Sequence, residues 1–534
     1  MKKYIFILII VLASILRLYD LGKAPPSLYW DEVSLGYNAY SILKTAHDEH
    51  GKFLPITNFG AFGDYKPPGY IYATVPSIAI FGLTEFAVRF PSALFGILTV
   101  ALTYFLTKKL FNNEIVANIS ALFLAISPWH IQFSRAAFEA NAGLFLSTLG
   151  IYLFVKFAKD KTIFIFPATL SFLAAMYTFT GQRLFVPFIL IILSIQFYKE
   201  MLTNKKTVLI AAVTGIILLL PLYKFATTTI EGKLRFNEVT IFKDLNPIND
   251  SIKYRQQDGF AKYADLIHNR RFMFAYDYIG HYSDAFDPSF LFFHGDVNPR
   301  LSSQGVGELY LFDFILVLSG IYFIISKKQK YSFLILGWLI VSPLGPATAR
   351  ETPHALRMVH ILPTYQLLSA FGLYNLYLSF KKRGKTVILL GSIIVSASVF
   401  YYLHFYYLHY PKQYSGEWQY GYKEAINYIQ PIYQEYDKIL VSDHLGRAYI
   451  YLLFYLKIDP KEYQKTASVV RDNFYFYNVN GFGKFIITTD YSKYYQKNTL
   501  IIASPQGLTS NMVKLKTISD LQNNPVFDIG AIQK

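Results

Sequence analysis

The sequence predicts a polytopic α-helical membrane protein that carries a soluble α/β domain at its C-terminal end. Three observations predict this class: an apolar composition, eleven long apolar runs, and basic residues that concentrate in alternate loops. Of the 534 residues, 53% are hydrophobic and only 16% are charged, whereas a soluble chain carries about 25% charged residues. Cysteine is absent, which excludes disulfides, thiol nucleophiles and thiolate-bound metals.

The apolar runs define the expected membrane-spanning helices, because such a helix needs roughly 20 mostly apolar residues. The runs fall at residues 4–21, 86–107, 115–126, 141–155, 162–178, 184–198, 207–225, 309–326, 331–344, 357–380 and 386–408. The first run follows Lys2 and Lys3, as in a signal peptide, but no small-residue cleavage site precedes Pro25 and Pro26. We therefore interpret it as a retained anchor.

Basic residues collect in one set of loops, at residues 2–3, 108–114, 156–161, 199–206, 327–330 and 381–385. These segments hold 17 Lys and Arg residues against three acidic ones, which accounts for about +14 of the net charge of +16. Loops rich in Lys and Arg stay in the cytoplasm. With an odd number of spans, we expect the N-terminus inside and the C-terminus outside a plasma membrane. Because topology explains the basic charge, nucleic acid is not an expected partner.

The other loops are expected on the outer face of a transmembrane domain that covers residues 1–408. They span residues 22–85, 127–140, 226–308 and 345–356. Residues 409–534 form the expected extracytoplasmic α/β domain. Within it, apolar runs at 438–442, 484–489 and 500–503 predict strands, and residues 422–433 and 447–456 predict helices.

Two adjacent carboxylates, Asp31 and Glu32, follow the first span directly. Carboxylates are costly near lipid and tend to be retained there for function. One of them could act as a general base on an acceptor hydroxyl or amine. The alternative is a solvated loop pair or the first turn of a helix, where acidic residues are favoured.

Two further outer loops supply cations. Lys66 precedes the rigid pair Pro67 and Pro68 and suits a lipid phosphate as a point charge, although snorkelling at the membrane interface would also explain it. Arg135 and Glu139 lie four residues apart, so on a helix they share a face. Taken alone, this spacing favours an ordinary i,i+4 pair on a solvated turn.

Later loops repeat this pattern. His354 and Arg357 lie at the outer start of the tenth run, and Asp296 and Arg300 occupy a polar turn before the eighth. These four residues predict substrate or phosphate contacts, or else interface anchoring and loop capping. The segment 47–50, His-Asp-Glu-His, has metal-ligand residue types in a spacing that fits no common site, so no cofactor is assigned and a divalent metal stays open.

The placement of these clusters is more informative than any one of them. All fall on the face opposite the basic loops, and they combine carboxylates with cations near the membrane plane. This combination fits transfer from a lipid-linked phosphate donor. The chain contains neither a P-loop nor a GxGxxG motif, so a nucleotide donor is not indicated.

The first 90 or so residues carry an ordered pattern: Arg17, Pro25, Asp31-Glu32, Gly36, Gly51, Pro55, Tyr65-Lys66-Pro67-Pro68, Phe81-Gly82, Glu85, Val88-Arg89 and Pro91-Ser92. This pattern resembles the opening of family 39 glycosyltransferases. These are GT-C membrane enzymes related to protein O-mannosyltransferases and to lipid A aminoarabinose transferases. The resemblance continues more loosely to about residue 380 and does not cover the tail.

The resemblance implies a GT-C fold, a polyprenyl- or dolichyl-phosphate sugar donor, and inversion at the anomeric carbon. Asp31 matches the catalytic carboxylate, Glu32 its companion, and Lys66 the lysine that meets the carrier phosphate. Arg135 and Glu139 lie where the second outer loop of the family contributes to the site. His354 and Arg357 lie where a late loop could close on the phosphate. No MIR domain is recognisable, which weakens the case for a protein acceptor.

We therefore expect a hexosyl- or pentosyltransferase that moves a sugar to a lipid, glycan or protein acceptor. One alternative is an oligosaccharide ligase or polymerase that uses a diphosphate-linked donor. Another is a transporter or lipid flippase, which would place ionisable groups near the bilayer midplane and show inverted repeats. The predicted spans are almost free of charge, which favours the enzyme.

Overall fold

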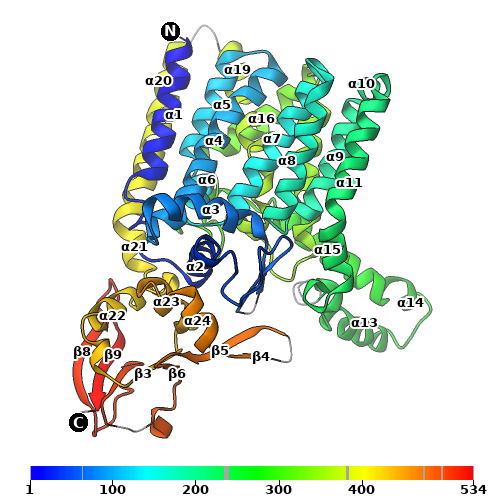
Figure 1. Ribbon diagram of the computed structural model, residues 1–534. Helices are drawn as coiled ribbons and strands as arrows, with labels where there is room; N and C mark the ends of the chain where they lie inside the picture. Colours follow the sequence, from blue (N-terminus) through cyan, green and yellow to red (C-terminus); the bar gives the residue numbers. More distant parts are fainter. Residues whose placement is uncertain are drawn as a thin grey trace. The chain divides into compact units, whose positions relative to one another are not determined.

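The computed structural model describes residues 2–62, 64–233, 240–380, 384–472, 475–494 and 497–532. The chain is mainly helical, with a mixed sheet near its C-terminal end (Figure 1). Its contacts divide it into two compact units. Unit 1 comprises residues 1–17, 95–133 and 139–402, and unit 2 comprises residues 18–94, 134–138 and 403–534. Part of the last basic loop, residues 381–383, lies outside the described residues.

Each of the eleven predicted apolar runs contains a helix. These helices are α1 (Lys2–Leu18), α4 (Glu85–Phe111), α5 (Glu114–Ile126), α7 (Glu139–Lys159), α8 (Ile165–Thr178), α9 (Gln182–Gln196), α11 (Lys205–Thr228), α16 (Leu311–Ser326), α17 (Ser332–Val341), α19 (Thr364–Ser379) and α20 (Gly384–His404). The tenth helix starts at Thr364, seven residues later than predicted, because residues 355–361 form two short helical turns instead.

Within the described residues, four helices are long and apolar enough to cross a membrane. A fifth span results if α5 and α6 (Pro128–Arg135), which meet at an angle of 56°, are counted as one. Small residues allow close packing inside unit 1. A Cβ atom added at Gly320 on α16 would lie 2.2 Å from the carbonyl oxygen of Leu368 on α19, and such close approach is a common basis of helix association in membranes.

Unit 1 also contains most of the predicted loop 226–308. In its described part the chain forms α13 (Asn246–Gln257), α14 (Ala264–Ile267) and α15 (Arg270–Asp284). This loop is therefore largely helical.

Unit 2 gives the predicted first outer loop a regular structure. The loop folds into α2 (Trp30–Thr45), a hairpin of β1 (Phe59–Ala61) and β2 (Asp64–Lys66), and α3 (Pro68–Phe81). Helix α2 begins with a capping box, in which the Glu32 carboxylate accepts a hydrogen bond from the N–H of Tyr29. Pro68 starts α3, a position that suits proline because a first-turn N–H has no helical partner.

The C-terminal part of unit 2 contains a seven-stranded sheet of order β4-β5-β6-β3-β7-β9-β8. The strands are β3 (Lys438–Val441), β4 (Ser468–Arg471), β5 (Tyr477–Phe482), β6 (Phe485–Ile487), β7 (Thr499–Ala503), β8 (Val513–Ser519) and β9 (Pro525–Ile532). Strand β3 is parallel to both β6 and β7, and the other pairs are antiparallel. The three predicted strands are confirmed as β3, β6 and β7.

The helices α22 (Tyr422–Ile429), α23 (Ala448–Tyr455) and α24 (Pro460–Thr466) accompany this sheet. Helix α2 packs on α23, where a Cβ atom at Gly36 would lie 2.9 Å from the Phe454 ring. The hydroxyl of Tyr37 donates to the carbonyl oxygen of Ile458 at 3.1 Å. Residues 22–85, the predicted first outer loop, and the C-terminal segment therefore share unit 2. A domain boundary at residue 408 stays a prediction.

Candidate active site

An ion pair between Asp31 and Lys66 is the most accessible of the predicted site contacts in unit 2. The Lys66 Nζ atom lies 2.8 Å from Asp31 Oδ1. The side chain of Asp31 is 23% exposed and that of Lys66 is 7% exposed. Asp31 occupies the first turn of α2, and Lys66 ends β2 just before Pro67 and Pro68. Rigid elements on both sides thus hold a reachable carboxylate beside a cation.

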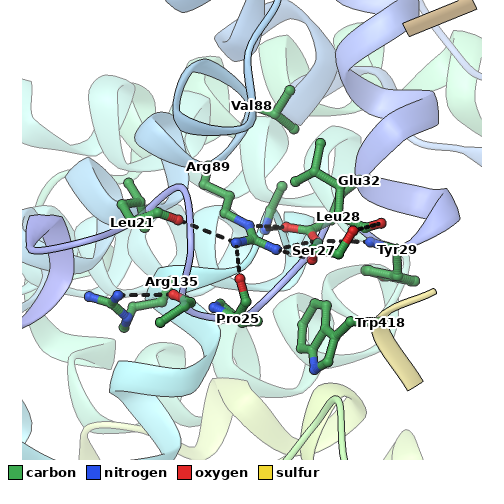
Figure 2. Close-up of polar contacts among 12 residues, drawn as sticks. Leu21, Pro25, Ser27, Leu28, Tyr29, Glu32, Val88, Arg89, Arg135 and Trp418 are labelled. Atoms are coloured by element: carbon green, nitrogen blue, oxygen red, sulfur yellow. Dashed lines mark hydrogen bonds and ion pairs between the residues drawn. The ribbon is translucent and has the colours of Figure 1, made fainter. Parts of the chain in front are cut away.

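The adjacent Glu32 is fully buried, and its carboxylate is occupied by neighbours (Figure 2). Arg89 donates to both of its oxygens at 2.9 Å. The backbone N–H groups of Ala137 and Tyr29 add contacts at 2.7 and 3.3 Å. These contacts make Glu32 the anchor of the first turn of α2. Its predicted role as the catalytic companion of Asp31 stays a prediction.

Arg89 organises the segment that leads into α2. Besides Glu32, it donates to the carbonyl oxygens of Leu21, Pro25 and Ser27 at 3.2, 2.8 and 2.5 Å (Figure 2). Its guanidinium lies 5.6 Å from the centre of the Trp418 ring. Sequence reasoning did not assign Arg89 to the site. An arginine near the start of a long apolar helix was the available signal, because charged groups there are rare and usually paired.

Arg135 is also fully buried in unit 2. It donates to the carbonyl oxygens of Ala24 at 2.9 Å and Asp20 at 3.4 Å, and its guanidinium lies over the rings of Tyr407 and Tyr406 at 5.1 and 5.6 Å. These contacts brace the segment between α1 and α2. The predicted contact of Arg135 with donor phosphate stays a prediction.

The remaining predicted site residues belong to unit 1. Asp296 is buried and accepts hydrogen bonds from the N–H groups of Ala355 at 2.6 Å and Asn298 at 2.8 Å, and burial raises its pKa. Asp296 therefore links the loop before α16 to the turn that follows His354. Burial, together with the nearby Arg357 charge, lowers the pKa of His354 to about 3, so this ring is neutral at physiological pH.

Arg357, Arg300 and Glu139 complete the unit 1 group. Arg357 is partly exposed, lies 3.8 Å from a carboxylate oxygen of Glu351, and donates to the Glu351 carbonyl oxygen at 3.0 Å. The carbonyl oxygen of Arg300 accepts from Gln132 Nε2 at 2.7 Å. Glu139 is half-buried and begins α7. The structure thus pairs Asp31 with Lys66 in unit 2, and in unit 1 it pairs Arg357 with Glu351.

The segment 47–50 forms part of the interior of unit 2. Glu49 is fully buried and accepts a hydrogen bond from Asn38 at 3.0 Å and another from the Tyr449 hydroxyl at 3.5 Å. Burial raises the pKa of Glu49 to about 8 and lowers that of His50 to about 3. The His50 ring stacks on Tyr477 at 3.8 Å. In the described part of the chain, no three His, Asp or Glu side chains gather as a metal site would require.

The helical unit and the carboxylate–lysine pair on the predicted first outer loop agree with what the resemblance to family 39 glycosyltransferases implies. Over residues 7–227, the chain matches the family described as dolichyl-phosphate-mannose-protein mannosyltransferase. An uncharacterized protein of Aquifex aeolicus (strain VF5) is 32% identical over 168 residues, which is 31% of this chain and 32% of that protein. The match therefore spans about a third of this curated relative.

Solved structures share the fold over most of the chain. The apo structure of ArnT from Cupriavidus metallidurans has a TM-score of 0.58, and the structure bound to undecaprenyl phosphate has a TM-score of 0.57. Each is 12% identical in sequence, and each match covers 98% of this chain and 97% of the ArnT chain. The archaeal oligosaccharyltransferase AglB from Archaeoglobus fulgidus has a TM-score of 0.50 with 13% identity over 85% of this chain and 63% of its own. The predicted GT-C fold and the resemblance to protein mannosyltransferases are thereby confirmed.

Proposed function

We propose that this protein transfers a sugar from a polyprenyl-phosphate-linked donor to a lipid, glycan or protein acceptor on the outer face of the cytoplasmic membrane. The Asp31–Lys66 pair carries the proposal, because it sets a reachable carboxylate beside a cation on a rigid frame. The match to the mannosyltransferase family supports it. So does the fold shared with ArnT, which has been solved with undecaprenyl phosphate bound.

The chemistry follows from the roles of the two groups. Asp31 accepts the proton of the acceptor hydroxyl or amine as that atom bonds to the anomeric carbon of the donor sugar. The bond between this carbon and the phosphate oxygen breaks, and its electron pair leaves with the carrier phosphate. Lys66 stabilises the charge that develops on that phosphate. Attack from the side opposite the phosphate inverts the anomeric carbon.

Buried neighbours hold this pair in place. Glu32, with Arg89, fixes the first turn of α2 and so the direction of the Asp31 side chain, which makes Glu32 a positioning residue. Arg135 braces the preceding segment in the same way. Arg357 is a partly exposed cation of the unit 1 group and remains proposed for the donor phosphate. His354, Glu139, Asp296 and Arg300 remain proposed for substrate binding.

We further propose that the eleven apolar helices cross the membrane, with the N-terminus inside and the C-terminus outside. The imbalance of 17 basic to three acidic residues in one set of loops supports this orientation. With this orientation, the predicted site residues of both units would lie on the outer face of the membrane.

The decisive experiment is the Asp31→Asn variant, purified in detergent and assayed for transfer of labelled sugar from undecaprenyl-phosphate donors to extracted membrane acceptors. Asparagine keeps the volume and removes the basicity, so we expect a loss of about 10²–10⁴-fold, typical of general-base removal. Asp20→Asn is the matched control, since the Asp20 carboxylate is exposed and lies 3.9 Å from the exposed Lys23.

A thermal melt confirms that the Asp31→Asn protein is folded. Turnover near that of the wild type in a folded Asp31→Asn protein would overturn the mechanism. Glu139 would then be the next carboxylate to test.

A further inference from the structure

A polar cavity of about 480 Å³ lies in the C-terminal sheet of unit 2, away from the Asp31–Lys66 pair in sequence. It opens where the parallel strands β3 and β6 end, at the paired residues Val441 and Ile487. Asp443 and Thr488, which follow these strands, line it. In open α/β sheets, ligands bind in the crevice outside the carboxyl ends of parallel strands.

The side chains around this cavity have the chemistry that recognises a saccharide. The half-buried Tyr477 supplies ring surface, the buried Tyr449 lies behind it in the lining, and Asn478 and Asn480 supply amides that both donate and accept hydrogen bonds. Aromatic rings offer apolar surface to the C–H face of a sugar, while amides pair with its hydroxyl groups. Arg447 adds a cation, which Asp443 balances, so the cavity suits a neutral or singly charged sugar.

Buried neighbours fix the two tyrosine rings. Tyr477 stacks on His50 with ring centres 3.8 Å apart and planes within 9° of parallel. The Tyr449 hydroxyl donates to the buried Glu49 at 3.5 Å. Rings held in this way need little ordering when a ligand binds, and a pre-organised site loses less entropy on binding.

The cavity wall contacts the tip of the hairpin β1–β2. The Arg447 guanidinium lies 5.1 Å from the centre of the Phe62 ring at that tip. Gly60 lies so close to the Tyr477 ring that a Cβ atom there would be 2.4 Å from Cε2, so only glycine fits. At the base of the same hairpin, Lys66 pairs with Phe59. Each strand is three residues long, so the base lies about 10 Å from the tip.

We propose that this cavity binds a saccharide unit of the acceptor and so presents a neighbouring acceptor hydroxyl to Asp31. The proposal rests on the function proposed above and selects a glycan-bearing acceptor from the three acceptor classes. The hairpin connects the two sites, because its tip contacts the cavity wall and its base carries Lys66.

The test measures saccharide binding directly, independently of transfer. Labelled full-length protein is applied to an array of neutral, amino and acidic saccharides of one to four sugar units. The detergent is an amine oxide, because the headgroup of a maltoside detergent is itself a saccharide and would compete. We expect the wild type to bind a defined subset, and Asn480→Ala and Arg447→Gln to bind it at least tenfold more weakly. Asn511→Ala, at an exposed position of unit 2 outside the cavity, should bind as the wild type does.

Folding is checked by thermal melts, and intact donor binding by titration with undecaprenyl phosphate. Absence of saccharide binding by the wild type, or equal binding by the cavity variants, would overturn the proposal. An equal loss in Asn511→Ala would also overturn it. The Asp31→Asn variant separates the two proposals, because it should bind the array normally whether or not its transfer activity is lost.

Discussion

Glu32 and Arg89 form a two-bond ion pair between fully buried side chains that lie 57 residues apart in the sequence. Such a pair is stable only while both partners are present, because either charge left alone in the interior is poorly solvated. In this protein the pair fixes the residue next to Asp31. The stability of the fold and the geometry of the proposed base are therefore coupled at this point.

Breaking this pair should destabilise the protein strongly. Arg89→Met leaves the Glu32 carboxylate buried without its cation, which typically costs about 3–5 kcal/mol. We expect a clear fall in the melting temperature of the purified protein. Lys108→Met is the matched control: Lys108 and Glu114 are 45% and 34% exposed, and such pairs contribute about 0–1 kcal/mol. Equal melting temperatures for the two variants would contradict the anchoring role of Arg89.

Removing the Lys66 charge should weaken donor binding. Loss of one hydrogen bond to a charged group costs about 1.5–3 kcal/mol, so Lys66→Ala should bind undecaprenyl phosphate about 10- to 150-fold more weakly, and Lys66→Arg should recover part of the loss. Titration in detergent measures both affinities, with Lys23→Ala as the control at an exposed lysine. An unchanged affinity in Lys66→Ala would make this residue an interface anchor.

The buried Glu49 should make stability depend on pH above neutrality. Its pKa is raised from 4.5 to about 8 in the folded state, so the folded protein holds a proton that the unfolded chain has released. Stability therefore falls as the pH rises towards 8. The lowered pKa of His50 acts in the opposite direction, but only below its unfolded value of 6.5. Between about pH 6.5 and 8, His50 therefore does not oppose the Glu49 effect.

The measurement compares melting temperatures of the wild type and Glu49→Gln across this range. Glutamine cannot ionise, so the melting temperature of the variant should not share the loss caused by Glu49. The melting temperature of Glu49→Gln relative to that of the wild type should therefore rise steadily from pH 6.5 to 8 and stay constant above pH 8. Glu417→Gln, at an exposed position of the same unit, controls for the added glutamine. If the melting temperatures of the wild type and Glu49→Gln changed equally with pH over this range, Glu49 would already be ionised in the folded protein at pH 6.5.

The proposed topology can be mapped with single cysteines, since the chain contains none of its own. Cysteines at the exposed positions Ser283 and Asn511 should react with an impermeant reagent added to intact cells. A cysteine at the exposed Thr203 should react only after permeabilisation. Reaction of the Thr203 position in intact cells would reverse the orientation and with it the placement of the site.

The apolar helices and the central strands could be predicted from the sequence because each carries its own signal. Long apolar runs gave all eleven helices, and the short runs gave β3, β6 and β7 at the centre of the sheet. Strand β4 could not be found in this way, because all four of its residues are exposed and its apolar residues do not face a core. Helix α2 was missed because its polar residues, such as Asn38 and Ser41, are buried by tertiary contacts.

The site was only partly predictable for a similar reason. Asp31 and Lys66 both stood out in the sequence, but their 2.8 Å contact depends on how the hairpin β1–β2 returns to α2. Glu32 and Arg89 both lie in the family-like pattern, yet their pairing across 57 residues has no local signature. Residue type and loop position could indicate chemistry, whereas the division between reacting and positioning groups required burial and hydrogen-bond partners.

The long-range contacts of α2 set the order in which the enzyme is completed during synthesis. The N–H of Trp30 donates to Gln419, 389 residues later in the chain, and the carbonyl oxygen of Leu28 accepts from Tyr451, 423 residues later. At about 5–20 residues per second, the ribosome delivers these partners roughly 20–80 s after the loop that carries Asp31. The nascent chain therefore contains the loop that carries Asp31 well before Gln419 and Tyr451 are available to hold it.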